Sequence, residues 1–148
     1  YKDAGLTLPF VQDNYSRSAQ GVLRGLHFQK TKPQGKLVSC SLGEVFDVAV
    51  DLRPNSPTYG QWEGVTLSES NHIQFYVPPG FAHGFVVVSE VADFQYKCTD
   101  YYAPDCDGAV AWDSCGIDWG FDGTPVLSEK DARAPRFEDF DSPFVWEG

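Results

Sequence analysis

The chain has 148 residues, 42% of them apolar, and its 21 acidic residues against 11 basic ones give a formal net charge of −10. This length fits one domain with its own core, so we expect a single domain over residues 1–148. The acidic balance argues against nucleic-acid or anionic-membrane binding, and no apolar run approaches the ~18 residues of a membrane span. Any anionic ligand must then be met by a few well-placed cations.

The predicted elements are short β-strands. In chain order, a short and more uniformly apolar run that suits a strand covered on both faces comes first, at Leu37–Leu42. Two alternating runs follow, at Glu44–Arg53 and His72–Val77. A second uniformly apolar run lies at Phe85–Val88, and a third alternating run at Ala92–Lys97. A period of two predicts half-buried strands with distinct faces.

Alternation assigns faces to two of these strands. Within residues 44–53, one face carries Phe46, Val48, Val50 and Leu52, while Asp47 and Asp51 take the other. Within residues 92–97, Tyr96 falls on the apolar face, where its hydroxyl needs a polar partner. Packing with a bonded hydroxyl is the alternative to a functional role for Tyr96.

Proline and glycine separate the strands, with turn signals at Pro54–Pro57, Pro78–Gly80 and Pro104–Gly108. No window keeps a helical stripe before the tail, and after Pro125 the chain becomes charged, which predicts one short helix or turn and an irregular tail. Many short strands at nearly regular spacing favour an all-β fold, an antiparallel sandwich or jelly-roll barrel.

The densest polar cluster surrounds Arg24 and His27. In a regular strand these two side chains would point to opposite faces, but Gly25 between them can mark a bulge that brings both toward one cavity. Taken singly, His27 is more often a hydrogen-bonded core residue, Lys36 a lysine that extends to solvent, and His83 a turn histidine. Their joint occurrence is what favours a functional site.

Metal ligation has little support in the pattern. The histidines are His27, His72 and His83, without an HxH or HxxxH pair, and a metal site normally needs two or three imidazoles plus a carboxylate. The four cysteines form no CxxC pair, so we expect reduced thiols. With no visible secretory signal in YKDAGLTLPF, we expect a cytoplasmic protein.

Several sequence blocks resemble one enzyme family. QDNYSRSAQGVLRGLHFQ (12–29), GKLV (35–38), GEVFDVAVDLRPNSPTYGQW (43–62), PPGFAHGF (78–85), YKCTDYYAP (96–104) and LSEKD (127–131) occur in the order typical of the dTDP-4-dehydrorhamnose 3,5-epimerase family. The resemblance implies a cupin-type jelly-roll barrel, a homodimer that works without metal or organic cofactor, and a dTDP-4-keto-6-deoxy sugar as substrate. The implied reaction inverts C3 and C5 of dTDP-4-dehydro-6-deoxy-glucose and gives dTDP-4-dehydro-L-rhamnose.

The resemblance also implies roles for individual residues. It makes His27 the general base with Asp131 as its carboxylate partner, Tyr96 the general acid, and Lys36 the ammonium beside the sugar ketone. The substrate contacts that it implies are Gln12, Asp13, Asn14, Arg24, Lys36, His83, Lys130 and Asp107, where many relatives carry Glu. The aromatic residue that stacks on thymine is left open between Tyr76, Tyr101 and Tyr102.

Family members usually carry an upstream segment with an Arg and a Glu that reach the nucleotide-sugar, and we expect this chain to lack it. Three alternatives therefore stay open beside the double epimerase. One is a mono-epimerase acting at C3 or C5 only, and another is a barrel that binds a nucleotide-sugar without turning it over. The third is a metal-dependent cupin oxygenase, which only the fold suggests.

Overall fold

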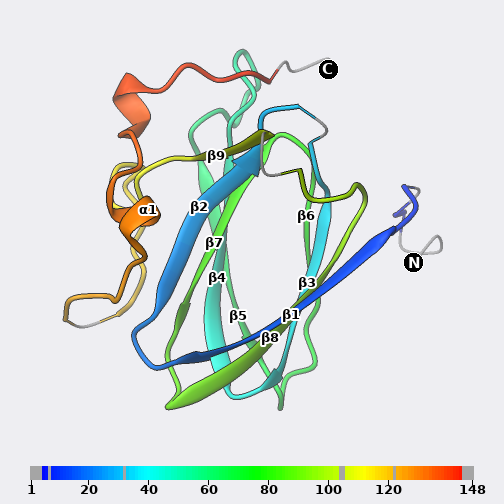
Figure 1. Cartoon of the computed structure of the whole chain (residues 1–148), viewed down its shortest axis with the longest axis vertical. Helices are drawn as coiled ribbons and strands as arrows, with labels where there is room; N and C mark the ends of the chain where they lie inside the picture. The colour runs from blue at the N-terminus through cyan, green and yellow to red at the C-terminus, as the bar shows by residue number, and fades with distance from the viewer. Residues whose placement is uncertain (1–4, 7, 32, 104–105, 122, 145–148) are drawn as a thin grey trace.

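The computed structural model describes residues 5, 6, 8–31, 33–103, 106–121 and 123–144, and these form two antiparallel sheets packed face to face (Figure 1). One sheet has four strands in the order β1 (Gln12–Ala19), β8 (Val91–Cys98), β3 (Lys36–Leu42) and β6 (Phe75–Val77). The other has five in the order β5 (Trp62–Ser68), β4 (Glu44–Asp51), β7 (Phe81–Val87), β2 (Leu23–Gln29) and β9 (Asp107–Ala109). The all-β jelly-roll prediction is confirmed, although the sheets do not close into a continuous barrel.

The strand predictions differ from the structure in a few places. Only Phe75–Val77 of the predicted strand 72–77 is a strand. His72 has a φ of 56°, and the Asn71 side chain accepts a bond from the Ile73 amide at 3.1 Å, so a turn occupies the first half of that run. Alternation did not indicate β5, and β7 begins four residues before the predicted start at Phe85. The predicted turn at 104–108 falls partly outside the described residues.

The prediction that β4 is half-buried was wrong, because both of its faces are covered. Its apolar face packs under the C-terminal part of the chain, where Val48, Val50 and Leu52 form a core with Trp119. Its other face turns toward the four-stranded sheet, and there Asp47 and Asp51 are 0% and 1% exposed. A carboxylate in such a position needs hydrogen-bond partners inside the sandwich.

The tail after residue 125 was expected to hold one short helix or turn, and it contains a short α-helix and a 3-10 turn. α1 (Glu129–Ala132) is capped by Ser128, whose hydroxyl accepts a bond from the Asp131 amide at 3.1 Å, and the 3-10 turn η3 (Phe137–Asp139) follows. In Figure 1 α1 lies beside β2, on the outer side of the five-stranded sheet. This placement brings Asp131 against β2, where it is 2% exposed.

Two further expectations concern the chain as a whole. Within the described ranges, no helix is long and apolar enough to cross a membrane. Cys40, Cys98, Cys106 and Cys115 are all free thiols, in agreement with the expected reduced state.

Candidate active site

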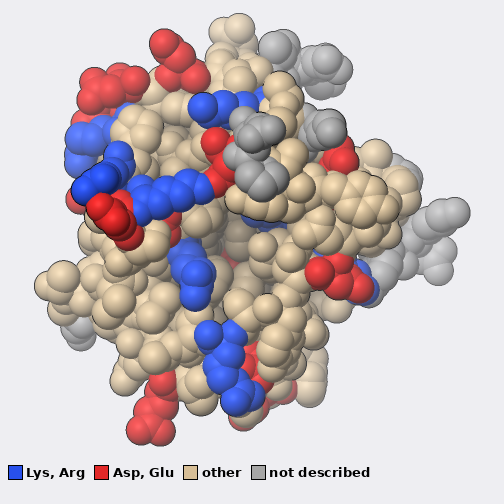
Figure 2. Space-filling model, in the orientation of Figure 1, with Lys and Arg blue, Asp and Glu red and all other residues tan. Residues whose placement is uncertain are grey.

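A cavity of about 260 Å³ between the two sheets brings together residues that are far apart in the sequence. Figure 2 shows a hollow near the middle of one face of the molecule with Lys and Arg side chains beside it, although the chain as a whole is acidic. Six predicted site residues from five strands line the cavity: Asn14, Arg24, His27, Lys36, His83 and Tyr96.

A bulge in β2 puts Arg24 and His27 on the same side. The pairing of β2 with β7 shifts register between these two residues. Gly25 lies between them with a φ of 140°, and a Cβ on it would come within 2.6 Å of the Gly84 Cα. Only glycine suits that backbone and that contact. The prediction of a Gly25 bulge is confirmed, because both side chains line one cavity.

His27 is held by a buried carboxylate. Its Nε2 hydrogen-bonds Asp131 Oδ1, while Asp131 Oδ2 accepts the Gly25 amide at 3.2 Å. Burial opposes ionisation of Asp131, but the bond and charge of His27 and the Gly25 amide outweigh it and hold the pKa of Asp131 below its usual value. An ionised Asp131 accepts only, so Nε2 carries the proton and Nδ1 is the basic nitrogen of the neutral ring.

Tyr96 and Lys36 meet on the opposite sheet. Tyr96 extends from β8 into the cavity, and Lys36 Nζ lies 5.4 Å from the centroid of its ring. Burial raises the pKa of the Tyr96 phenol, which therefore stays protonated at neutral pH and can donate. Burial lowers the pKa of Lys36, and the charges of Cys98 and Asp47 counteract that effect.

The residue that sequence reasoning missed is Asp47. Its two carboxylate oxygens both lie 2.9 Å from His83 Nε2, and His83 lines the cavity while Asp47 lies behind it, fully buried. A sequence signal for it existed: an aspartate within the apolar run 45–50 requires a partner in the fold. Strand alternation alone suggested an outward-facing position instead.

Four predicted contacts lie outside the cavity lining: Gln12, Asp13, Asp107 and Lys130. Gln12 accepts the Tyr102 amide through Oε1 at 2.7 Å, which joins β1 to the chain that follows β8. Asp107 on β9 and Lys130 on α1 form an ion pair with each other. Their ion pair connects β9 to the C-terminal tail. Tyr102, the partner of Gln12, is 50% exposed.

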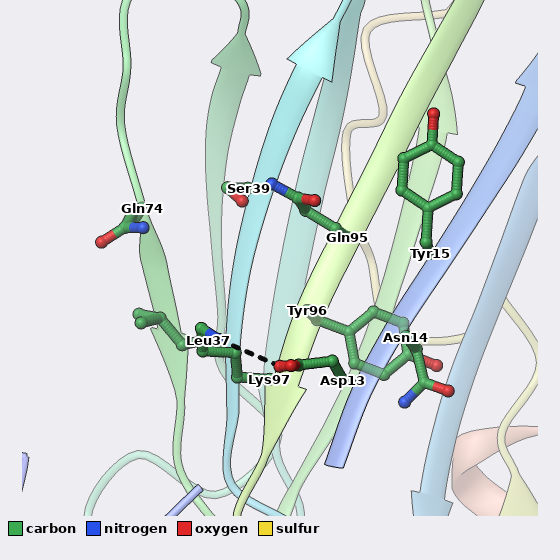
Figure 3. Close-up of a pocket in the computed structure, with 9 residues that line it drawn as sticks. All are labelled: Asp13, Asn14, Tyr15, Leu37, Ser39, Gln74, Gln95, Tyr96 and Lys97. Atoms are coloured by element: carbon green, nitrogen blue, oxygen red, sulfur yellow. Dashed lines mark hydrogen bonds and ion pairs between the residues drawn. The ribbon is translucent and has the colours of Figure 1, made fainter.

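The Asp13 side chain lies elsewhere. It lines a hollow on the outer face of the four-stranded sheet, where its Oδ1 accepts from Lys97 Nζ at 3.0 Å (Figure 3). Strand alternation explains this, since neighbouring Asn14 points inward. Among the aromatic candidates, Tyr76 lines a separate cavity with Phe75 and Phe81. Tyr101 is exposed beside Tyr102.

Metal ligands do not converge within the described part of the chain. No group of three or more His, Cys, Asp or Glu side chains there could hold a metal ion. His72 is exposed on the turn before β6 and does not line the cavity of His27 and His83.

Comparison with known proteins agrees with this geometry. The family model described as dTDP-4-dehydrorhamnose 3,5-epimerase matches residues 1–139. A Salmonella typhimurium protein of that name is 57% identical over 137 residues, which cover 90% of this chain and 75% of the relative. A Legionella pneumophila dTDP-6-deoxy-D-glucose-3,5-epimerase, solved with dTDP-4-keto-L-rhamnose, superposes with a TM-score of 0.96 at 51% identity, covering 99% of this chain and 80% of that one.

A mono-epimerase is also similar. The structure of a 3'-monoepimerase from Streptomyces bikiniensis with dTDP-quinovose has a TM-score of 0.84 at 34% identity and covers 91% of this chain and 70% of that one. The two 3,5-epimerases above are 57% and 51% identical and therefore closer in sequence. From the family match, these identities and the shared fold, we conclude that the chain belongs to the dTDP-4-dehydrorhamnose 3,5-epimerase family.

Proposed function

We propose that the chain inverts C3 and C5 of dTDP-4-dehydro-6-deoxy-glucose by proton transfer, without a metal or an organic cofactor. The observation that carries this proposal is one cavity lined by an Asp131-held imidazole, a protonated phenol and an ammonium, from His27, Tyr96 and Lys36. The names and ligands of its relatives support the same substrate.

The chemistry follows from the ketone at C4 of the sugar. This carbonyl acidifies the hydrogens on both neighbouring carbons, and inversion needs proton removal from one face and return to the other. His27 Nδ1 takes the proton, and Asp131 stabilises the imidazolium that forms. Tyr96, on the facing sheet, supplies a proton from the opposite side of the ring. His27 then releases its proton to water and the Tyr96 phenolate takes one from water, and the reset pair repeats the exchange at the second carbon to complete the double inversion.

The enolate oxygen that develops at C4 needs a positive partner. Lys36 lies beside Tyr96 in the cavity and supplies an ammonium there. Loss of one such group in a site shielded from water costs about 10²–10³ in kcat. Arg24, whose Nη2 donates to Ser18 at 3.3 Å, is placed to bind the diphosphate with its planar fork. Lys130 can bind the diphosphate as a second cation when its ion pair with Asp107 opens.

Incubation of the 4-keto sugar with the protein in heavy water tests this function. We expect proton NMR of the product to show deuterium at both C3 and C5. A single labelled carbon would support the mono-epimerase, and binding of dTDP without any label would support the non-catalytic barrel. The His27→Asn variant should lose the exchange, and exchange at the native rate in that variant would remove His27 from the mechanism.

The proposal extends to the surroundings of the enzyme. The chain forms a single domain over residues 1–148, and the family match over most of its length supports this. Two such chains pair as a homodimer, which the family resemblance implies. A cytoplasmic location agrees with four free thiols, because a reducing compartment maintains that state. Sedimentation of the purified protein tests the dimer, which requires twice the 16.4 kDa mass of the chain.

A further inference from the structure

The wall of the cavity contains a second buried carboxylate with no direct access to a ligand. Asp47 is 0% exposed on β4, behind His83, which is 5% exposed on β7. Both Asp47 oxygens lie 2.9 Å from His83 Nε2. Any effect of Asp47 on chemistry in the cavity must therefore pass through other side chains.

The first effect concerns the protonation of His83. When Asp47 is ionised it accepts hydrogen bonds only, so His83 Nε2 then carries the proton and Nδ1 is left as an acceptor. The ring also stacks on Phe94, with centroids 5.9 Å apart and planes inclined by 16°. Asp47 and Phe94 together fix both the tautomer and the orientation of His83, which suits acceptance of a hydrogen bond from a sugar hydroxyl.

The second effect concerns the charge of Lys36. Tyr96 and Cys98 lie near this ammonium on β8, His83 lies near it on β7, and Asp47 lies beyond His83. Burial raises the pKa values of Tyr96 and Cys98, which keeps both groups neutral, and burial lowers the pKa of His83, which favours the neutral ring.

A Cys98 thiolate would raise the pKa of Lys36 more than Asp47 does, but the Cys98 thiol is neutral, so Asp47 is the group whose negative charge acts on Lys36 among the described residues. Burial raises the pKa of Asp47, and the hydrogen bond from His83 and the charge of Lys36 counteract that effect. An ionised Asp47 and a charged Lys36 therefore favour each other in the low dielectric of the sandwich. A neutral Lys36 could not stabilise an enolate in the same way.

We propose that Asp47 is a positioning residue of the epimerase, which fixes the tautomer of His83 and keeps Lys36 in its ammonium form inside the cavity. This inference rests on the proposed function for its catalytic consequence. Its physical content, a charged Lys36 that depends on the charge of Asp47, does not require a substrate.

The Asp47→Asn variant tests the proposal, because its amide oxygen can still accept from His83 while the negative charge is lost. We expect the alkaline limb of kcat/KM to move down by about one to three pH units, with loss of activity at high pH and partial recovery at lower pH. In a Lys36→Met background the same substitution should move the limb no further. Asp51→Asn is the matched control, since Asp51 is equally buried but bonded to Arg53, and it should leave the limb in place.

Lysine ¹³Cε NMR of the native protein without substrate, assigned with Lys36→Met, keeps the inference testable if Asp47→Asn does not fold. We expect Lys36 to be charged at pH 7 in the native protein and to titrate at lower pH in Asp47→Asn. A neutral Lys36 at pH 7, or the same Lys36 titration in both proteins, would overturn the proposal even if the native chain labels both carbons. Absence of labelling together with the expected titration would overturn the function instead.

Discussion

The dyad of His27 and Asp131 gives a prediction that follows directly from its hydrogen bonds. One Asp131 oxygen accepts a hydrogen bond from His27 Nε2 and the other accepts from the Gly25 amide, so both carboxylate oxygens act as acceptors. In Asp131→Asn one acceptor becomes an NH₂ donor. If the remaining oxygen serves Gly25, the NH₂ faces His27 and moves the ring proton to Nδ1, where the base is needed.

The alternative arrangement of the variant is no better. If the amide oxygen serves His27, the NH₂ opposes the Gly25 amide, and an unsatisfied buried donor costs about 1–3 kcal/mol. In both arrangements the imidazolium loses the negative charge that stabilises it. We therefore expect kcat to fall by about 10²–10⁴, the range for acid–base positioning in enzymes.

Deuterium exchange into the 4-keto sugar under saturating substrate measures this loss. Asp113→Asn is a suitable control, because Asp113 is an exposed carboxylate that pairs with Arg136 at 3.5 Å. Circular dichroism should show that both variants are folded. A kcat for Asp131→Asn within about threefold of the native value would refute the assignment of the tautomer to Asp131.

Three further predictions concern the scaffold. Gly25→Ala places a Cβ 2.6 Å from Gly84 Cα at a φ of 140°. We expect the free energy of unfolding, measured with urea, to fall by about 1–3 kcal/mol and deuterium exchange into the sugar to decrease. Unchanged stability would contradict the strain at Gly25. Arg53→Met removes the ion-pair partner of buried Asp51 and should lower the free energy of unfolding by about 3 kcal/mol. A free energy of unfolding equal to that of the native protein would contradict this prediction. Burial opposes ionisation of Asp51, but the hydrogen bonds from Arg53 outweigh burial and lower the pKa of Asp51. The ionised Asp51 therefore contributes fully to stability above pH ~3.9, and this contribution is lost as the pH falls further. The free energy of unfolding of Asp51→Asn should depend less on acid pH than that of the native protein, and an identical dependence would contradict this.

The sequence predicted the fold class and the site cluster because both follow from local patterns. Alternation places Tyr96 on the inward face of its strand, and the structure agrees. Gly25 between Arg24 and His27 indicated the bulge that unites them, since glycine in a strand commonly marks such an irregularity.

Other features depend on packing between distant segments, which local patterns do not contain. The two faces of β4 are both buried because the tail covers one and the second sheet covers the other, so Asp47 could not be recognised from alternation. The Asn71 side chain accepts a hydrogen bond from the Ile73 amide in a turn, so the strand predicted from His72 begins only at Phe75. Asp13 was expected at the substrate, but its parity on β1 turns it to the outer face.

The central claim is that a sugar ring lies between His27 and Tyr96 in one cavity, with its C4 oxygen toward Lys36. A crystal structure of this protein with dTDP-glucose, which lacks the C4 ketone and cannot react, tests it most directly. We predict the hexose between the two side chains and the diphosphate beside Arg24. A hexose bound in the outer hollow of Figure 3, or outside the sandwich altogether, would contradict the account.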